Sequence, residues 1–144
     1  MSLVPDKTQT VTFRELQDVL NANRKMQDYI RNNNTDVHAM QLSFASFASA
    51  ILGLAFWQYT AGSIAYGIVS IVTGVGAMTR DDALQAVKDG ETEILRVSNT
   101  MSFLGADTAN ITVGYTVLDL EKKVSAPSSA KTNYMTKNGI IITG

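Results

Sequence analysis

The feature that most constrains this chain is a stretch of 43 residues, 37 to 79, that contains no Asp, Glu, Lys or Arg. All 12 basic and 13 acidic residues lie in the two flanks. Large apolar side chains separated by Ala, Ser and Gly fill the stretch, and side chains of this kind are buried in folded proteins. They could be buried in the chain's own core, in a lipid bilayer, or against neighbouring copies of the chain.

The charge-free stretch is expected to fold as a hairpin of two apolar helices. Residues 40–59 would span about 30 Å as one helix, which is the thickness of the hydrocarbon of a bilayer. Residues 60–63 predict a turn, and residues 64–78 predict a second, shorter arm. A helix on the surface of a monomer needs a polar face, and neither arm has one. The pattern therefore favours burial outside the chain's own monomer.

The first flank predicts an amphipathic helix over residues 12–31. Thr12 and Glu15 have the spacing of a capping box, in which a hydroxyl and a carboxylate each accept a bond from a backbone N–H at the helix start. Apolar residues then recur close to every 3.6 positions. The Asn run at 32–34 is expected to end the helix, because Asn side chains compete for the helical backbone.

A second capping signal, Thr79 with Asp82, begins the other flank. The apolar spacing that follows predicts a helix to about Phe103. The dipeptide Asp89-Gly90 also fits the turn of a β-hairpin, so two strands are an alternative for this segment.

The end of the chain has β signals. Apolar and small polar residues alternate over 111–117, which predicts a strand, and Asn138-Gly139 predicts the turn of a final hairpin. The whole chain is thus predicted to be mainly α with a small β portion, as one structural unit. Its three parts are an amphipathic helical flank (1–36), an apolar helical hairpin (37–79) and a polar helical and β region (80–144).

Small residues at four-residue spacing predict close helix contacts in the central stretch, in a membrane or in a protein assembly alike. These residues are Ala45, Ser49, Gly53, Ser63, Gly67, Ser70 and Gly74. Trp57, Tyr59 and Tyr66 are the aromatic residues expected at an interface, where rings with a polar edge are favoured.

Several kinds of chemistry are not indicated. The chain has no Cys, which excludes disulfides and thiolate nucleophiles. Its one His, His38, has no marked catalytic partner, and Asp81 and Asp82 are better explained by the helix start than as metal ligands. A net charge of −1 offers no basic field for nucleic acid. We expect no cofactor, metal, nucleic acid or small-molecule substrate.

These features favour a non-enzymatic subunit of a large homo-oligomeric assembly, in which the hairpin is buried against neighbouring copies. By analogy of layout alone, the assembly would be of the virion or phage-tail type. The alternative is a holin-like hairpin that anchors in or permeabilises a bilayer. A soluble enzyme or binding module would need a pocket that the sequence does not indicate. The first residues, MSLVPDKTQTVTF, lack the pattern of a signal peptide. We therefore expect the protein to reach a virion, another extracellular assembly or a membrane without a cleaved leader.

Overall fold

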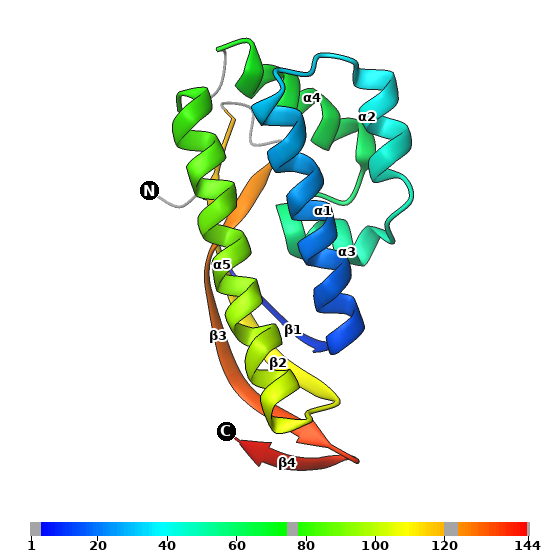
Figure 1. The fold of residues 1–144 in the computed structure, drawn as a ribbon, viewed down its shortest axis with the longest axis vertical. Coiled ribbons are helices and arrows are strands. Elements are labelled where there is room, and N and C mark those ends of the chain that lie inside the picture. Colours follow the sequence, from blue (N-terminus) through cyan, green and yellow to red (C-terminus); the bar gives the residue numbers. More distant parts are fainter. Residues whose placement is uncertain (1–3, 75–77, 120–123, 144) are drawn as a thin grey trace.

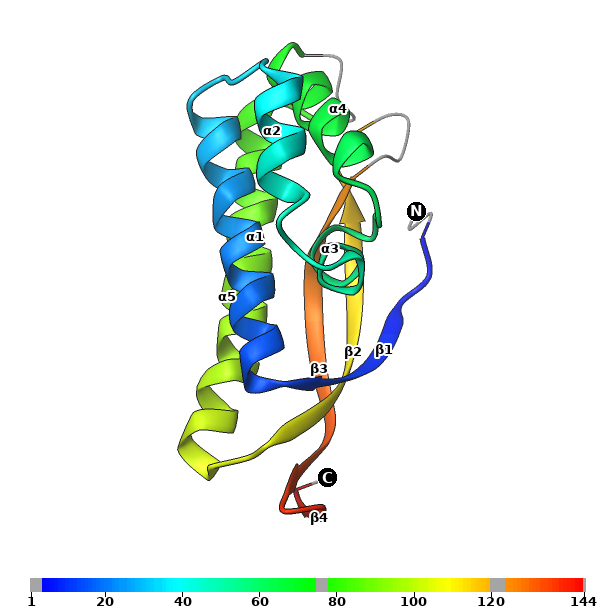
Figure 2. The same cartoon turned by 90° about the vertical axis from the view of Figure 1, so that its right-hand side faces the viewer.

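The chain folds as a layer of helices on one face of an antiparallel sheet (Figures 1 and 2), in a computed structural model that describes residues 4–74, 78–119 and 124–143. Within these residues there are five helices and four strands. In chain order they are β1 (Lys7–Thr12), α1 (Phe13–Arg31), α2 (Val37–Phe44), α3 (Ser49–Phe56), α4 (Ala61–Val72), α5 (Arg80–Leu104), β2 (Thr108–Val117), β3 (Ser125–Lys137) and β4 (Ile140–Thr143). Every neighbouring pair in the strand order β1-β2-β3-β4 is antiparallel.

The helix α1 confirms the prediction for the first flank. Thr12 Oγ1 accepts the N–H of Glu15 at 3.1 Å, and Glu15 Oε1 accepts the N–H of Thr12 at 2.9 Å, so both halves of the capping box are present. The apolar face of α1, which includes Leu16, Leu20 and Met26, is fully buried. This long helix runs beside α5, with both on the same face of the sheet (Figure 2).

The segment that begins at Arg80 is one continuous helix, so the alternative of a hairpin at Asp89-Gly90 is wrong. Thr79 Oγ1 accepts the N–H of Asp82 at 3.1 Å, as the capping signal predicts. Gly90 is buried where α5 packs on β3, and a Cβ there would lie 2.7 Å from the carbonyl oxygen of Pro127. The glycine therefore permits a close approach of helix and strand and does not form a turn.

The predicted fold class, mainly α with a small β portion, is wrong because the sheet is a full layer of the structure. The prediction missed β1, the strand KTQTVT that lies directly before the capping box. Thr and Val favour strands, and β1 pairs along its whole length with β2. The strand over 111–117 and the hairpin at Asn138-Gly139 are confirmed as parts of β2 and of the β3–β4 connection.

The predicted two-helix hairpin over 37–79 is also wrong, because the stretch is broken into α2, α3 and α4. The hydroxyl of Ser46 donates to the carbonyl of Ser43 at 2.7 Å. Such a bond from a side chain to a nearby backbone group competes with the backbone hydrogen bonds that would continue the helix. The described residues contain no single helix that is long and apolar enough to cross a bilayer. Only α2 together with the stretch Ser49–Val72 meets those criteria, as a pair bent by 112°.

The second break lies between α3 and α4. Trp57 ends α3 in the left-handed conformation, with φ of 53°, and its indole Nε1 donates to the carbonyl of Pro5 at 2.8 Å. Thr60 then caps α4 through the N–H of Ser63. A residue distant in sequence therefore holds the bend in place.

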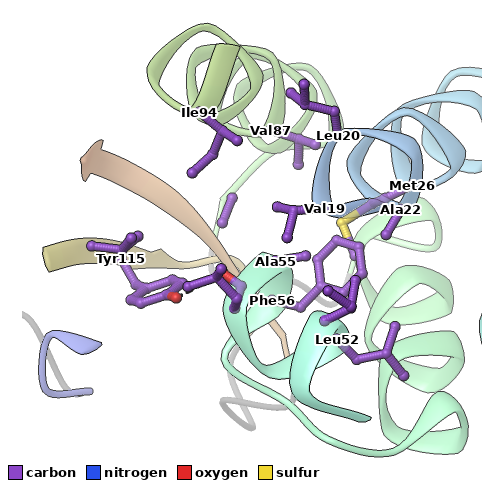
Figure 3. Packing of buried hydrophobic residues seen from close by; sticks show 14 of the residues in the cluster. Val19, Leu20, Ala22, Met26, Leu52, Ala55, Phe56, Val87, Ile94 and Tyr115 are labelled. Carbon is purple, nitrogen blue, oxygen red and sulfur yellow. Dashed lines mark hydrogen bonds between the residues drawn. The ribbon is translucent and has the colours of Figure 1, made fainter. Parts of the chain in front are cut away.

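The apolar stretch supplies much of the chain's own core, so the expectation that it is buried outside the monomer is wrong for most of its large side chains. Figure 3 shows Leu52, Ala55 and Phe56 of α3 packed against side chains of α1, and Phe56 is fully buried. The inner faces of α4 and α5 are buried in the same cluster. The six residues from Ile51 to Phe56 bury α3 on all sides, whereas α2 and α4 each bury only part of their surface.

Candidate functional site

The small residues predicted to make helix contacts do not form one stripe on the first arm. Ala45 lies at the exposed end of α2, whereas Ser49 and Gly53 belong to α3. Gly53 is buried, and a Cβ on it would overlap the ring of Tyr59. A larger residue at Gly53 would therefore have to displace the half-exposed ring of Tyr59 within the monomer.

The second arm also divides its predicted contact residues. Ser63 and Gly67 share α4, where Ser63 is half-buried and Gly67 is buried. Ser70 donates its hydroxyl to the carbonyl of Tyr66 at 3.1 Å. Gly74 lies beyond the helix end with φ of 82° and is exposed. The spacing of these residues therefore does not give them one common role.

The aromatic residues form an internal contact with the first strand. Lys7 places its ammonium nitrogen 4.7 Å from the ring centre of Trp57 and 4.2 Å from that of Tyr59, and it also donates to the hydroxyl of Tyr59. Such cation–π contacts stabilise by electrostatic attraction. Tyr66 lies apart from this cluster, on α4, with an exposed ring. The two aromatic residues Trp57 and Tyr59 thus hold β1 on the fold.

The most exposed large apolar side chains outside the central stretch gather at one end of the molecule. The C-terminal end of α5 and the β3–β4 hairpin both lie at this end (Figure 1), and Figure 2 shows them apart from each other. We call this surface the apolar end; its members are Phe103, Leu104, Ile140, Ile141 and Ile142. Phe103 is 89% exposed, Ile140 68% and Ile141 63%. Water therefore contacts an apolar surface at this end of the isolated chain.

Hydrogen bonds fix the two parts of the apolar end against each other. The N–H of Asp107 donates to the carbonyl of Thr136 at 2.7 Å, and the Asp107 carboxylate accepts the N–H of Asn138 at 2.6 Å. Gly105 ends α5 with φ of 67°, a conformation that favours glycine. Asn138 and Gly139 have φ of 53° and 79°, as a tight hairpin turn requires. The surface is thus held by defined turns at both ends.

Sequence reasoning identified the hairpin of the apolar end but not its exposure. The signal was present, because Ile140 to Ile142 are three consecutive apolar residues in the last strand. In a strand whose one face is buried, apolar and polar residues alternate. Three consecutive Ile residues break this alternation. Apolar side chains therefore lie on both faces of this strand.

The open face of the sheet is a second surface, formed mainly by neutral polar residues. Thr8 and Thr112 face each other across β1 and β2 with their hydroxyl oxygens 2.9 Å apart. Asn133 donates to Asn110 at 2.9 Å and to Thr112 at 3.0 Å. These bonds satisfy the polar groups largely among themselves, and the exposed Lys131, which is paired with Thr112, adds one charge to this otherwise neutral face.

Polar side chains between the two long helices, of which Gln27 is buried, have a structural role. Gln27 donates to Glu91 at 2.8 Å, and Arg24 donates to the other carboxylate oxygen at 2.5 Å. Burial raises the pKa of Glu91, but these two hydrogen bonds and the charge of Arg24 outweigh it and lower the pKa below its ordinary value. The three side chains bind α1 to α5.

No arrangement for catalysis is evident in the described parts of the chain. His38 is exposed in the first turn of α2. Asp81 and Asp82 lie in the first turn of α5, and no three His, Cys, Asp or Glu side chains among the placed residues gather where a metal ion could be held. One open hollow of about 380 Å³ lies between α5 and β3. It is lined by Arg96, Val97, Thr100, Ala130, Lys131 and Thr132.

Arg96 limits what this hollow can bind. Its guanidinium donates to Glu93 at 2.5 Å and to the carbonyl of Ala130 at 3.3 Å, and the Glu93 carboxylate also accepts the N–H of Ala130. The charge of Arg96 is therefore largely matched within the protein. The apolar end, whose apolar side chains are exposed to water, is the stronger candidate site.

Comparison of the chain with protein-family models, with curated proteins and with solved structures gave no match. The function is therefore argued from the chemistry of the described surfaces.

Proposed function

We propose that this chain is a non-enzymatic structural subunit that assembles with copies of itself through the apolar end. The observation that carries the proposal is the exposure of Phe103 and Ile140 to Ile142 at one end of the fold. Exposed apolar surface of this kind marks sites of interaction with other proteins or membranes. The low content of charged residues, 17%, also favours association over a dispersed monomer.

The area of the apolar end can be compared with what a contact between copies needs. Its five residues leave about 600 Å² exposed, taking roughly 200 Å² for a fully exposed residue of this size. The largest apolar patch on a typical monomer is about 300–600 Å², and a standard interface buries about 800 Å² on each partner. The exposed area of the five residues is therefore smaller than one partner's share, and the part on β4 lies on more than one face because neighbouring strand residues point to opposite faces.

The proposal differs from the expectation that the stretch 37–79 makes the contacts between copies. Most of the large side chains of that stretch are already buried in the monomer. The exposed apolar side chains of β4 and of the end of α5 are therefore the ones left to be buried by a contact between copies. That the assembly is of the virion or phage-tail type stays a prediction from the layout of the sequence. The bilayer alternative stays a prediction as well.

The mass of the protein in detergent-free solution tests the proposal. Multi-angle light scattering is expected to show an oligomer that dissociates on replacement of Phe103 with Asp. The matched control is Leu42→Asp, since Leu42 on α2 is also a large exposed apolar residue, 64% exposed, but lies outside the apolar end. A monomeric wild-type protein at high concentration would refute the proposal, as would equal dissociation by both variants. Flotation of the wild type with liposomes would favour the bilayer alternative.

A further inference from the structure

We infer that the occupant of the exposed β4 edge is β4 of a second copy, in an antiparallel pair with a two-fold axis at Ile141. The inference rests on the proposed function and specifies its contact. The strand order places β4 at one edge of the sheet, where it pairs with β3 alone among the described strands. Two copies joined in this way would form one continuous sheet of eight strands, with the helices of both copies on the same side.

The geometry of the hairpin determines which backbone groups face outward. Asn138 and Gly139 form a two-residue turn, and Lys137 and Ile140 are the closing pair of the hairpin. In an antiparallel ladder, hydrogen-bonded and non-hydrogen-bonded pairs alternate. The next pair, Thr136 with Ile141, is therefore non-hydrogen-bonded. Its Ile141 N–H and C=O point away from β3, toward the edge that a second strand would occupy.

The two edges of the sheet differ in how well they are protected. The edge strand β1 carries Lys7 and follows Pro5, and both residue types discourage pairing with another chain. The edge strand β4, with the sequence IIIT, contains no charge and no proline. Four residues make a short edge strand, and the register of β4 with β3 shifts at Ile142, which are features that themselves limit pairing. Of the two edges, β4 is nevertheless the one without a charge or a proline, and an apolar edge of this kind is expected to pair with another strand.

The chemistry of β4 selects a second copy over a charged partner. A two-fold axis at Ile141 places each Ile141 opposite its equivalent and brings Ile140 near Ile142 of the second copy, the residue at which the register of β4 with β3 shifts. Apolar β-branched pairs across strands stabilise a sheet, whereas like charges directly opposite destabilise it. The pairing therefore brings no charge against a like charge. It also brings the exposed side chains of Ile140, Ile141 and Ile142 of the two copies together.

A single cysteine tests this register directly, because the chain has no Cys of its own. In the proposed pair the two Ile141 residues form a hydrogen-bonded pair with Cα atoms about 5.5 Å apart. A disulfide requires a Cα separation of about 4.4–6.8 Å. Under mild oxidation, Ile141→Cys is expected to convert most of the protein to a covalent dimer on a non-reducing gel.

The matched control is Leu42→Cys, because the exposed fractions of Leu42 and Ile141 are 64% and 63%. It is expected to cross-link at least tenfold more slowly at the same protein concentration. Equal rates for the two variants, in a protein that light scattering shows to be oligomeric, would overturn the β4 pairing and leave the proposed function standing. A monomeric wild type would overturn both.

Discussion

Replacing Gly90 with Ala is expected to destabilise this protein, although the same change stabilises most helices. Gly90 lies in the interior of α5, where Ala is normally favoured over Gly by about 1 kcal/mol. Here a Cβ would lie 2.7 Å from the carbonyl oxygen of Pro127 and 3.0 Å from its Cδ. Both atoms belong to β3, and neither can rotate away as the end of a flexible side chain could.

The expected size follows from these two opposing contributions. Overpacking of a well-packed interior costs about 1–3 kcal/mol, and contact with backbone places this site in the upper part of that range. After subtraction of the gain in helix propensity of about 1 kcal/mol, the free energy of unfolding should fall by about 1–2 kcal/mol. For a chain of this length, that corresponds to a decrease in Tm of about 3–6 °C.

Circular dichroism during urea and thermal unfolding measures this effect. Thr92→Ala is a matched control, because Thr92 is exposed on the same helix two residues further on. Its hydroxyl bonds only to the carbonyl of Lys88 within the helix, so the variant is expected to gain a few tenths of a kcal/mol from helix propensity. If Gly90→Ala were as stable as the wild type or more stable, the close packing of α5 on β3 would be refuted.

Two further predictions concern Lys7 and Glu91. Lys7→Met removes the cation over Trp57, the only Trp, and should shift the tryptophan emission and lower the free energy of unfolding by about 0.5–1 kcal/mol; an unchanged spectrum would contradict the contact. Because the folded-state pKa of Glu91 is lowered, its carboxylate contributes stability above the ordinary pKa of 4.5, and this contribution is lost as the pH falls through the folded value. Urea midpoints of Glu91→Gln should therefore lie below those of the wild type at pH 7 and approach them near pH 3. A difference that stays constant with pH would count against the bonds from Gln27 and Arg24.

The elements that could be predicted from sequence depend on bonds between near neighbours. The capping box at Thr12 and the cap at Thr79 join residues three positions apart. The turn at Asn138-Gly139 depends on the conformational preferences of two adjacent residues. The helices α1 and α5 and the last hairpin were therefore predictable, because no distant partner is needed to define where they begin or turn.

The candidate site was only partly predictable. The sequence showed the hairpin that carries Ile140 to Ile142, but the exposure of Phe103 depends on what α5 packs against. The residues proposed for helix contacts, such as Gly53, were selected on the assumption of an unbroken helix. Once the helix is broken, four-residue spacing no longer places two residues on one face, so the prediction could not locate the surface.

By itself, the sequence determined that most of the large apolar side chains of the stretch 37–79 would be buried, because a run of apolar side chains without charge is costly to expose to water. Only the tertiary structure decided where they would be buried. The bend at Trp57 is held by Pro5, and α3 is joined to β2 by the bond from the Tyr115 hydroxyl to the carbonyl of Leu54, at 2.7 Å. These contacts join residues more than 50 positions apart, and no local pattern encodes them. The same distant packing left β4 and the end of α5 exposed, because the helices cover one face of the sheet and leave its edge open.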